Sequence, residues 1–151
     1  MNLRQNQKGF TIVELLIVVV VIAILAAMSI VMFTNISDRA AAAAAKTNAT
    51  SVRKVAEAYA SVNEQYPNQT AQFSSDISRL PAEIILLGNT AVGVTNGKNS
   101  INYDFRYNGT GIVGARIQYW DFENNTTETI YIGDASATTP SNQFYDIDTE
   151  V

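Results

Sequence analysis

The residues from Phe10 to Phe33 constrain this chain most, because they form an apolar run long enough to cross a membrane. The polar exceptions within the run are Thr11, Glu14 and Ser29. A helix rises about 1.5 Å per residue, so this run would be about 36 Å long, slightly more than a hydrocarbon core of about 30 Å. No Gly or Pro interrupts it, and a helix satisfies its own backbone polar groups, as lipid requires. We therefore predict a membrane-spanning helix over residues 10–33.

The carboxylate of Glu14 is the feature that a plain membrane anchor does not explain. A charged side chain in hydrocarbon costs up to about 3 kcal/mol on insertion scales, and less near the interface. Charges inside membranes usually have a partner, and the nearest basic residues, Arg4 and Lys8, both precede Gly9. We therefore expect the partner of Glu14 to come from another molecule. The alternative is a carboxylate that reaches the headgroups without a specific partner.

Residues 1–9 form a short basic leader in front of the apolar run. An ordinary secretory signal fits poorly, because its apolar region spans only about 7–15 residues before a small-residue cleavage site. Arg4 and Lys8 lie closer to the run than the basic residues that follow it, the first of which is Arg39. This asymmetry favours a cytoplasmic N-terminus and a single pass through the membrane.

Composition excludes several classes of function. The chain has no cysteine and no histidine, so it lacks thiolate nucleophiles, disulfides and the commonest general base and metal ligand. Its formal net charge is −4, which is unfavourable for general nucleic-acid binding. We expect no enzyme activity, no cofactor and no specific binding of nucleic acid.

The N-terminal residues "KGFTIVELLIVVVVIAILAA" resemble the signature of bacterial type IV prepilins and the related pseudopilins. The matching features are a short basic leader that ends in Gly9, then Phe10, then Glu14 as the fifth residue after Gly9, and an apolar helix. The resemblance covers roughly the first 30 residues. It implies that a membrane aspartyl prepilin peptidase cuts between Gly9 and Phe10 and methylates the new amine of Phe10.

The resemblance also implies how the mature chain would be used. The apolar helix would hold the subunit in the cytoplasmic membrane and then enter the core of a homo-oligomeric helical filament, built on an inner-membrane assembly platform. Glu14 would face the Phe10 amine of a neighbouring subunit. The expected function is a structural subunit of an extracellular type IV pilus in adhesion, twitching motility or DNA uptake. The alternatives are a pseudopilin of a type II secretion or competence system and, outside the family, a single-pass membrane protein with a ligand-binding head.

This chain departs from the resemblance in two respects. Many pilins carry helix-breaking Gly or Pro residues within the apolar helix, whereas residues 10–36 contain neither. Many pilins also close a C-terminal loop with a disulfide, which a chain without cysteine cannot form. Nothing in the sequence therefore weakens the helix so as to favour local melting on assembly, and a disulfide cannot close a C-terminal loop.

The helix is expected to continue beyond the membrane as an amphipathic segment over residues 34–66. The run from Ala40 to Ala45 has the highest intrinsic helix propensity. Apolar residues then follow at spacings of three and four, which forms one stripe: Val52, Val55, Ala56, Tyr59 and Val62. Pro67 cannot continue the helix and holds the residue before it extended. The stripe requires a covering layer.

The second half of the chain favours an antiparallel sheet. Residues 67–100 are predicted to be a connecting region with a short helix from Pro81 to Gly88. In residues 101–133, "INYDFRY" alternates apolar and polar residues, Asn108-Gly109 indicates a hairpin turn, and "GIVGARIQYWDF" and "TTETIYI" supply further strands. We predict an α+β fold: a long N-terminal helix with a three- to four-stranded antiparallel sheet packed on its second half. With the resemblance, this is the pilin fold.

Residues 134–151 are predicted to be a solvated acidic tail. Its aspartates suggest a calcium site formed by Asp134, Asp146 and Asp148, because hard cations prefer oxygen ligands. The spacing matches no calcium loop, so we predict no metal and keep this site as the alternative.

Charge is distributed unevenly along the predicted head. Arg39, Lys46, Arg53 and Lys54 make the neck basic, and from Asp121 onward all charged residues are acidic. We hypothesise that these regions of different subunits face each other.

Overall fold

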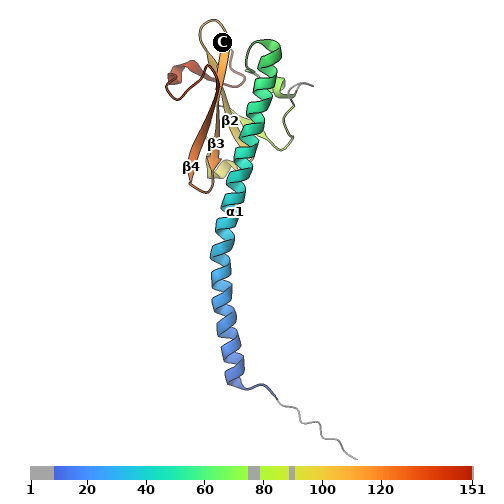
Figure 1. Cartoon of the computed structure of the whole chain (residues 1–151), viewed down its shortest axis with the longest axis vertical. Coiled ribbons are helices and arrows are strands. Elements are labelled where there is room, and N and C mark those ends of the chain that lie inside the picture. Colours follow the sequence, from blue (N-terminus) through green and yellow to red (C-terminus); the bar gives the residue numbers. More distant parts are fainter. Residues whose placement is uncertain (1–8, 75–78, 89–90, 151) are drawn as a thin grey trace, which may run out of the picture. The chain divides into compact units, whose positions relative to one another are not determined.

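A computed structural model describes residues 9–74, 79–88 and 91–150. The chain divides into two compact units, Met1–Ser37 and Asp38–Val151. Helix α1 spans Ile12–Asn63 and contributes residues to both units (Figure 1). The prediction of one helix that continues from the apolar run into the amphipathic segment is confirmed.

The apolar part of α1 in the first unit has the properties of a membrane-spanning segment. Its most apolar window has a mean hydropathy of 3.3, and none of that window is buried within the chain. Large apolar side chains along it are 47–85% exposed, from Val21 at the low end to Ile12 at the high end. By length and composition, this segment is suited to cross a membrane.

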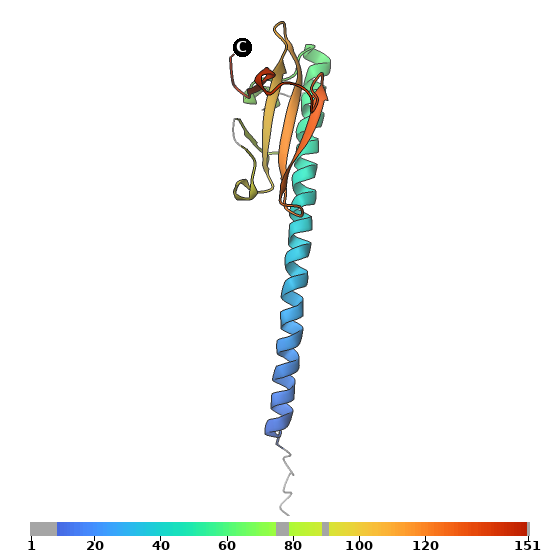
Figure 2. The ribbon, with the colours of Figure 1, turned by 90° about the vertical axis from the view of Figure 1, so that its left-hand side faces the viewer.

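The second unit contains a five-stranded mixed sheet in the order β1-β2-β3-β4, with β5 paired to β2. The strands are β1 Ile85–Leu87, β2 Ser100–Tyr107, β3 Ile112–Asp121, β4 Thr126–Gly133 and β5 Phe144–Asp146. Short 3₁₀ turns are η1 Thr70–Ser74, η2 Val94–Asn96 and η3 Ser141–Gln143. Strands β2, β3 and β4 form the predicted antiparallel meander (Figure 2).

Two further strands share one edge of β2, and the sequence analysis missed both. Strand β1 runs parallel to β2 and pairs with its first residues, Ser100 to Asn102, whereas β5 pairs antiparallel with Asp104 to Arg106. The predicted helix from Pro81 to Gly88 is therefore wrong, because a turn and β1 occupy this segment. The prediction of a solvated tail is also wrong in part, since β5 joins the sheet and Ile147 is buried.

The core lies between the second part of α1 and the inner face of the sheet. The helix contributes small residues at spacings of three and four: Ala45, Ala49, Val52 and Ala56, each no more than 1% exposed. The sheet contributes alternate residues of β2 and β3: Ile101, Tyr103, Phe105, Ala115, Ile117 and Tyr119. The alternation read from the sequence therefore correctly identified the inner face. Small helix residues allow the close packing that a dense core requires.

The opposite face of the sheet contains a buried polar layer. Asn102 and Asp104 are only 3% and 2% exposed. Arg116 donates from Nε and Nη2 to Asp104 Oδ2 at 3.0 and 2.6 Å, and Asn102 Nδ2 donates to the same oxygen at 3.0 Å. Burial raises the pKa of Asp104 above the ordinary value of 3.8, although the hydrogen bond and charge of Arg116 act in the opposite direction.

Substitution of Ala49 tests the close contact between α1 and the sheet. Ala49 is fully buried, so Ala49→Leu should overpack the core and reduce the free energy of unfolding by about 1–3 kcal/mol. Ala43 is exposed on the same helix, so Ala43→Leu is the matched control. Denaturant unfolding of the full chain in detergent micelles, followed by fluorescence of the single tryptophan, measures both variants. Equal stability of the two variants would contradict the predicted packing.

The buried carboxyl of Asp104 predicts a specific pH dependence. Because its folded pKa lies above the unfolded value, the folded state binds this proton more tightly, and ionisation of the buried group lowers stability. As the pH falls through the raised pKa towards 3.8, wild type should therefore gain stability relative to Asp104→Asn. Unfolding curves of both proteins across this window measure the difference. A relative loss for wild type would show that pairing with Arg116 outweighs burial.

Candidate functional site

The start of α1 is a reciprocal capping arrangement between Thr11 and Glu14. The N–H and the hydroxyl of Thr11 each donate to Glu14 Oε2 at 2.8 Å. In return, the N–H of Glu14 donates to Thr11 Oγ1 at 3.2 Å. This is the capping box expected for Thr followed three residues later by Glu, and it fixes the first helical residue as Ile12.

The capping box gives Glu14 a partner within its own chain that the sequence analysis missed. We expected a partner from another molecule, whereas Thr11 already supplies two neutral donors to one carboxylate oxygen. The spacing of Thr and Glu in "FTIVE" was the signal that identifies this pair. Within the described part of the chain, no donor reaches the other oxygen, Oε1, so the carboxylate retains an acceptor for a further group.

Gly9 and Phe10 precede the helix and are exposed. Phe10 is 92% exposed, and neither residue has helical structure. A Cβ built on Gly9 meets no atom within 4 Å, so the fold of this chain imposes no steric requirement for glycine there. The peptide bond between the two residues therefore lies in accessible backbone just outside α1.

The three aspartates of the alternative calcium site have separate partners or positions. Asp134 forms an ion pair with Arg106, with 2.6 Å between Oδ2 and Nη1. Asp148 accepts bonds from the N–H and hydroxyl of Thr70, each at 2.7 Å. Asp146 lies in β5 opposite Asp104. Across residues 9–74, 79–88 and 91–150, no group of three His, Cys, Asp or Glu side chains is placed to hold a metal ion. The structure does not bring these carboxylates together.

The charges of the neck are partly paired within the chain. Arg39 Nε lies 3.0 Å from Glu123 Oε1 on the β3–β4 turn, and Arg53 Nε lies 2.9 Å from Glu57 Oε1. All four side chains are at least 41% exposed, and such surface pairs typically contribute less than about 1 kcal/mol. These intrachain pairs would compete with the hypothesised pairing between the neck of one subunit and the acidic region of another.

The same turn contains Asp121, whose local bonds stabilise its charged form. A hydrogen bond from the Asn124 side chain is the main cause that lowers the pKa of Asp121, with smaller contributions from backbone N–H groups and the charge of Lys46. Asp121 and Lys46 line, together with Arg39 and Glu123, an open groove of about 310 Å³ between α1 and the β3–β4 turn. Both acidic and basic side chains line it, and Arg39 pairs with Glu123 across it.

Comparison with known proteins gives one match. Residues 4–30 match the family model described as the prokaryotic N-terminal methylation motif, which is the motif of type IV prepilins and pseudopilins. No curated protein and no solved structure matches the chain. The matched residues include Gly9, Phe10, Thr11 and Glu14. This motif supports a type IV pilin-like or pseudopilin precursor, and with the apolar helix it fits a membrane-anchored one.

Proposed function

We propose that this chain is the structural subunit of a type IV pilus. In this proposal, a prepilin peptidase removes residues 1–9, methylates Phe10, and releases a subunit that polymerises through its N-terminal helix. The observation that carries the proposal is the methylation motif over residues 4–30. It is supported by the exposed, non-helical backbone at Gly9 and Phe10, which a protease can reach.

The exposed apolar surface of α1 supports the proposal that the processed chain polymerises. Its large apolar side chains are 47–85% exposed from Ile12 to Ile36, so they need lipid or other apolar surfaces to leave water. In the precursor, the membrane supplies that surface. In a filament, the corresponding helices of other copies would supply it, and the helix would pass from one apolar environment to the other.

Glu14 would determine which group of a neighbouring copy the helix contacts when it passes from the membrane into the filament. Cleavage before Phe10 creates a new positive amine, whereas the Thr11 donors to Glu14 are neutral. Opposite charges attract strongly in a medium of low dielectric constant, and an unpaired charge there is costly. The open oxygen of Glu14 would accept the Phe10 amine of a neighbouring copy. Thr11 would satisfy the carboxylate before that partner arrives.

The proposal implies where the chain would be located and which partners it would have. The precursor would lie in the cytoplasmic membrane with its N-terminus in the cytoplasm, and the mature chain would lie in an extracellular filament. Its partners would be the peptidase, an inner-membrane assembly platform and identical subunits. We propose no enzyme activity and no cofactor for the head; adhesion, twitching motility or DNA uptake would be a property of the filament.

A pseudopilin is the second candidate, because its precursor carries the same motif. A pseudopilin would build a short rod for secretion or competence. Electron microscopy of sheared cells separates the two, since long filaments composed mainly of this chain favour a pilus.

Leader removal is the first prediction. The mature protein should begin at N-methylated Phe10, as measured by N-terminal sequencing and intact mass. Gly9→Val should retain the leader, because the added side chain obstructs the peptidase, whereas a Cβ at this position meets no atom within 4 Å in the folded chain. Native protein that keeps Met1–Gly9 would exclude the pilus and pseudopilin proposals together and would favour a single-pass membrane protein.

Incorporation into filaments is the second prediction. Glu14→Ala should leave membrane insertion intact and reduce incorporation at least about tenfold, because the carboxylate that receives the amine is absent. Ser29→Ala is the matched control, since the Ser29 hydroxyl donates to the Leu25 carbonyl of its own helix and to no other group in the described part of the chain. Quantitative immunoblots of sheared filaments and membranes measure both variants. Normal filaments from Glu14→Ala would reject the assembly role.

A further inference from the structure

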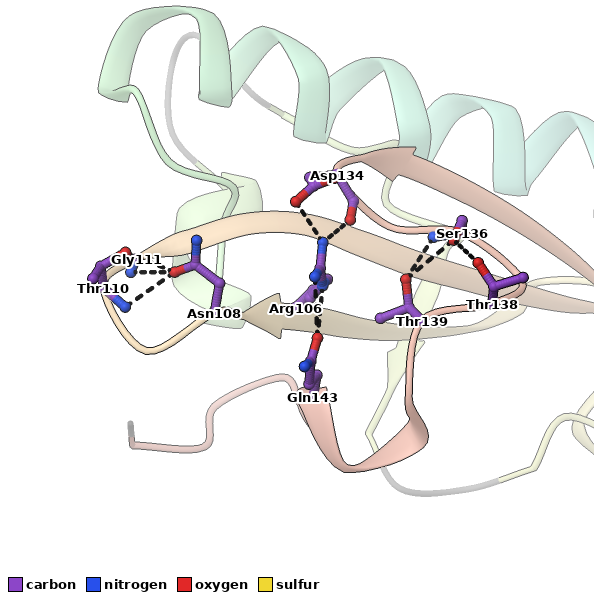
Figure 3. A network of polar contacts seen from close by, with 9 residues as sticks. All are labelled: Arg106, Asn108, Thr110, Gly111, Asp134, Ser136, Thr138, Thr139 and Gln143. Atoms are coloured by element: carbon purple, nitrogen blue, oxygen red, sulfur yellow. Dashed lines mark hydrogen bonds and ion pairs between the residues drawn. The ribbon is translucent and has the colours of Figure 1, made fainter.

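Arg106 joins the two ends of a surface loop, residues 134–143, which we name the strap. Its Nη1 donates to the backbone carbonyl of Asp134 and lies 2.6 Å from Asp134 Oδ2. Its Nε and Nη2 both donate to Gln143 Oε1 at 3.1 Å. Figure 3 shows Arg106 between these two partners. One guanidinium therefore contacts the first and the last residue of the strap.

Gly114 provides the space that this arrangement needs. It lies opposite Arg106 in the pairing of β2 with β3. A Cβ on Gly114 would come within 2.9 Å of the Ala135 nitrogen and 3.0 Å of the Asp134 nitrogen. A side chain at residue 114 would therefore clash with the backbone of the strap. Because Gly114 has no side chain, the start of the strap can cross the sheet directly above it. This close approach brings Asp134 within reach of Arg106.

The interior of the strap is tied mainly to itself. The N–H of Ser136 donates to Thr139 Oγ1 at 3.0 Å, and the N–H of Thr139 donates to the Ser136 carbonyl at 3.1 Å. Figure 3 shows this cluster of hydroxyl groups, with Thr138 beside Ser136. Most residues of the strap between its ends are exposed. Among the residues that the structure describes, no hydrogen bond or ion pair connects residues 135–142 to β2, β3 or β4.

The residues that follow the strap are anchored independently of Arg106. Tyr145 stacks on Phe105 with ring centroids 5.7 Å apart, and Ile147 is 8% exposed. Asp148 receives two bonds from Thr70 at 2.7 Å. On the other side, the N–H of Asp134 donates to the Val113 carbonyl at 2.9 Å. Release of Arg106 would therefore free the strap between two fixed points.

We propose that the strap is a latched loop and that Arg106 is its latch. The strap opens and closes as a local unit while the meander, α1 and β5 remain folded. Part of the latch is ionic, and the Asp134 side chain is 77% exposed, so salt weakens this arm. The device gives the head a hydroxyl-rich segment whose exposure changes without unfolding, and it does not depend on the proposed pilus function.

Hydrogen–deuterium exchange of the full chain in detergent micelles tests the latch. Arg106→Met keeps the length of the stem and removes every donor, so exchange of strap amides should rise about tenfold or more. Amides of α1, β3 and β4 should exchange as in wild type. Arg53→Met is the matched control, because it removes an exposed arginine whose ion pair, among the described residues, is with Glu57 of its own helix.

Two milder variants separate the arms and remain informative if Arg106→Met does not fold. Asp134→Asn removes the ionic arm, and Gln143→Leu removes the amide arm. Each should raise the exchange of strap amides by less than Arg106→Met does. Of these two variants, Asp134→Asn should abolish the salt dependence of strap exchange, whereas Gln143→Leu should keep it. Unchanged strap exchange in both variants would overturn the proposal. So would exchange that rises equally in the strap and the sheet, because the strap would then not be a separate unit.

Discussion

The apolar side chains of α1 between Ile12 and Ile36 must be removed from water, and their own chain does not cover them. This constraint dictates how the molecule can exist. Burial of apolar area is the main favourable term in folding and association, so a surface of this kind requires lipid or other helices. The methylation motif over residues 4–30 lies on the same segment. A membrane, and the filament that we propose, would each remove this apolar surface from water.

Charged groups in this chain are placed against specific partners. Glu14 accepts from Thr11 at the start of α1, Asp104 accepts from Arg116 in the sheet, and Arg106 donates to Asp134 at the strap. In each arrangement the ionised group takes part in charge-assisted hydrogen bonds, and for the buried Asp104 these bonds offset part of the cost of burial. The three interactions differ in how easily they can be broken. Asp104 is buried, whereas Glu14 and Asp134 keep access to solvent or to a new partner.

The second part of α1 organises the head. Its alanines and Val52 pack on one face of the sheet, while the opposite face carries a polar layer beside Phe144. Arg116 connects these features, because it binds Asp104 and lies 4.6 Å from the ring centroid of Phe144. The chain contains no cysteine, so side-chain hydrogen bonds and ring contacts hold the C-terminal segment in place of a covalent bond.

The sequence by itself determined the membrane-length helix, its continuation, the three strands of the meander and the motif around Gly9, Phe10 and Glu14. These features have strong local signals: hydropathy, a period of 3.6 or 2, turn residues and fixed spacing. Only the tertiary structure decided β1, β5 and the strap. Strands β1 and β5 have three residues each, and they persist because β2 supplies their hydrogen bonds. Tertiary contacts also separated Asp134, Asp146 and Asp148, because pairing between distant residues leaves no local pattern in the sequence.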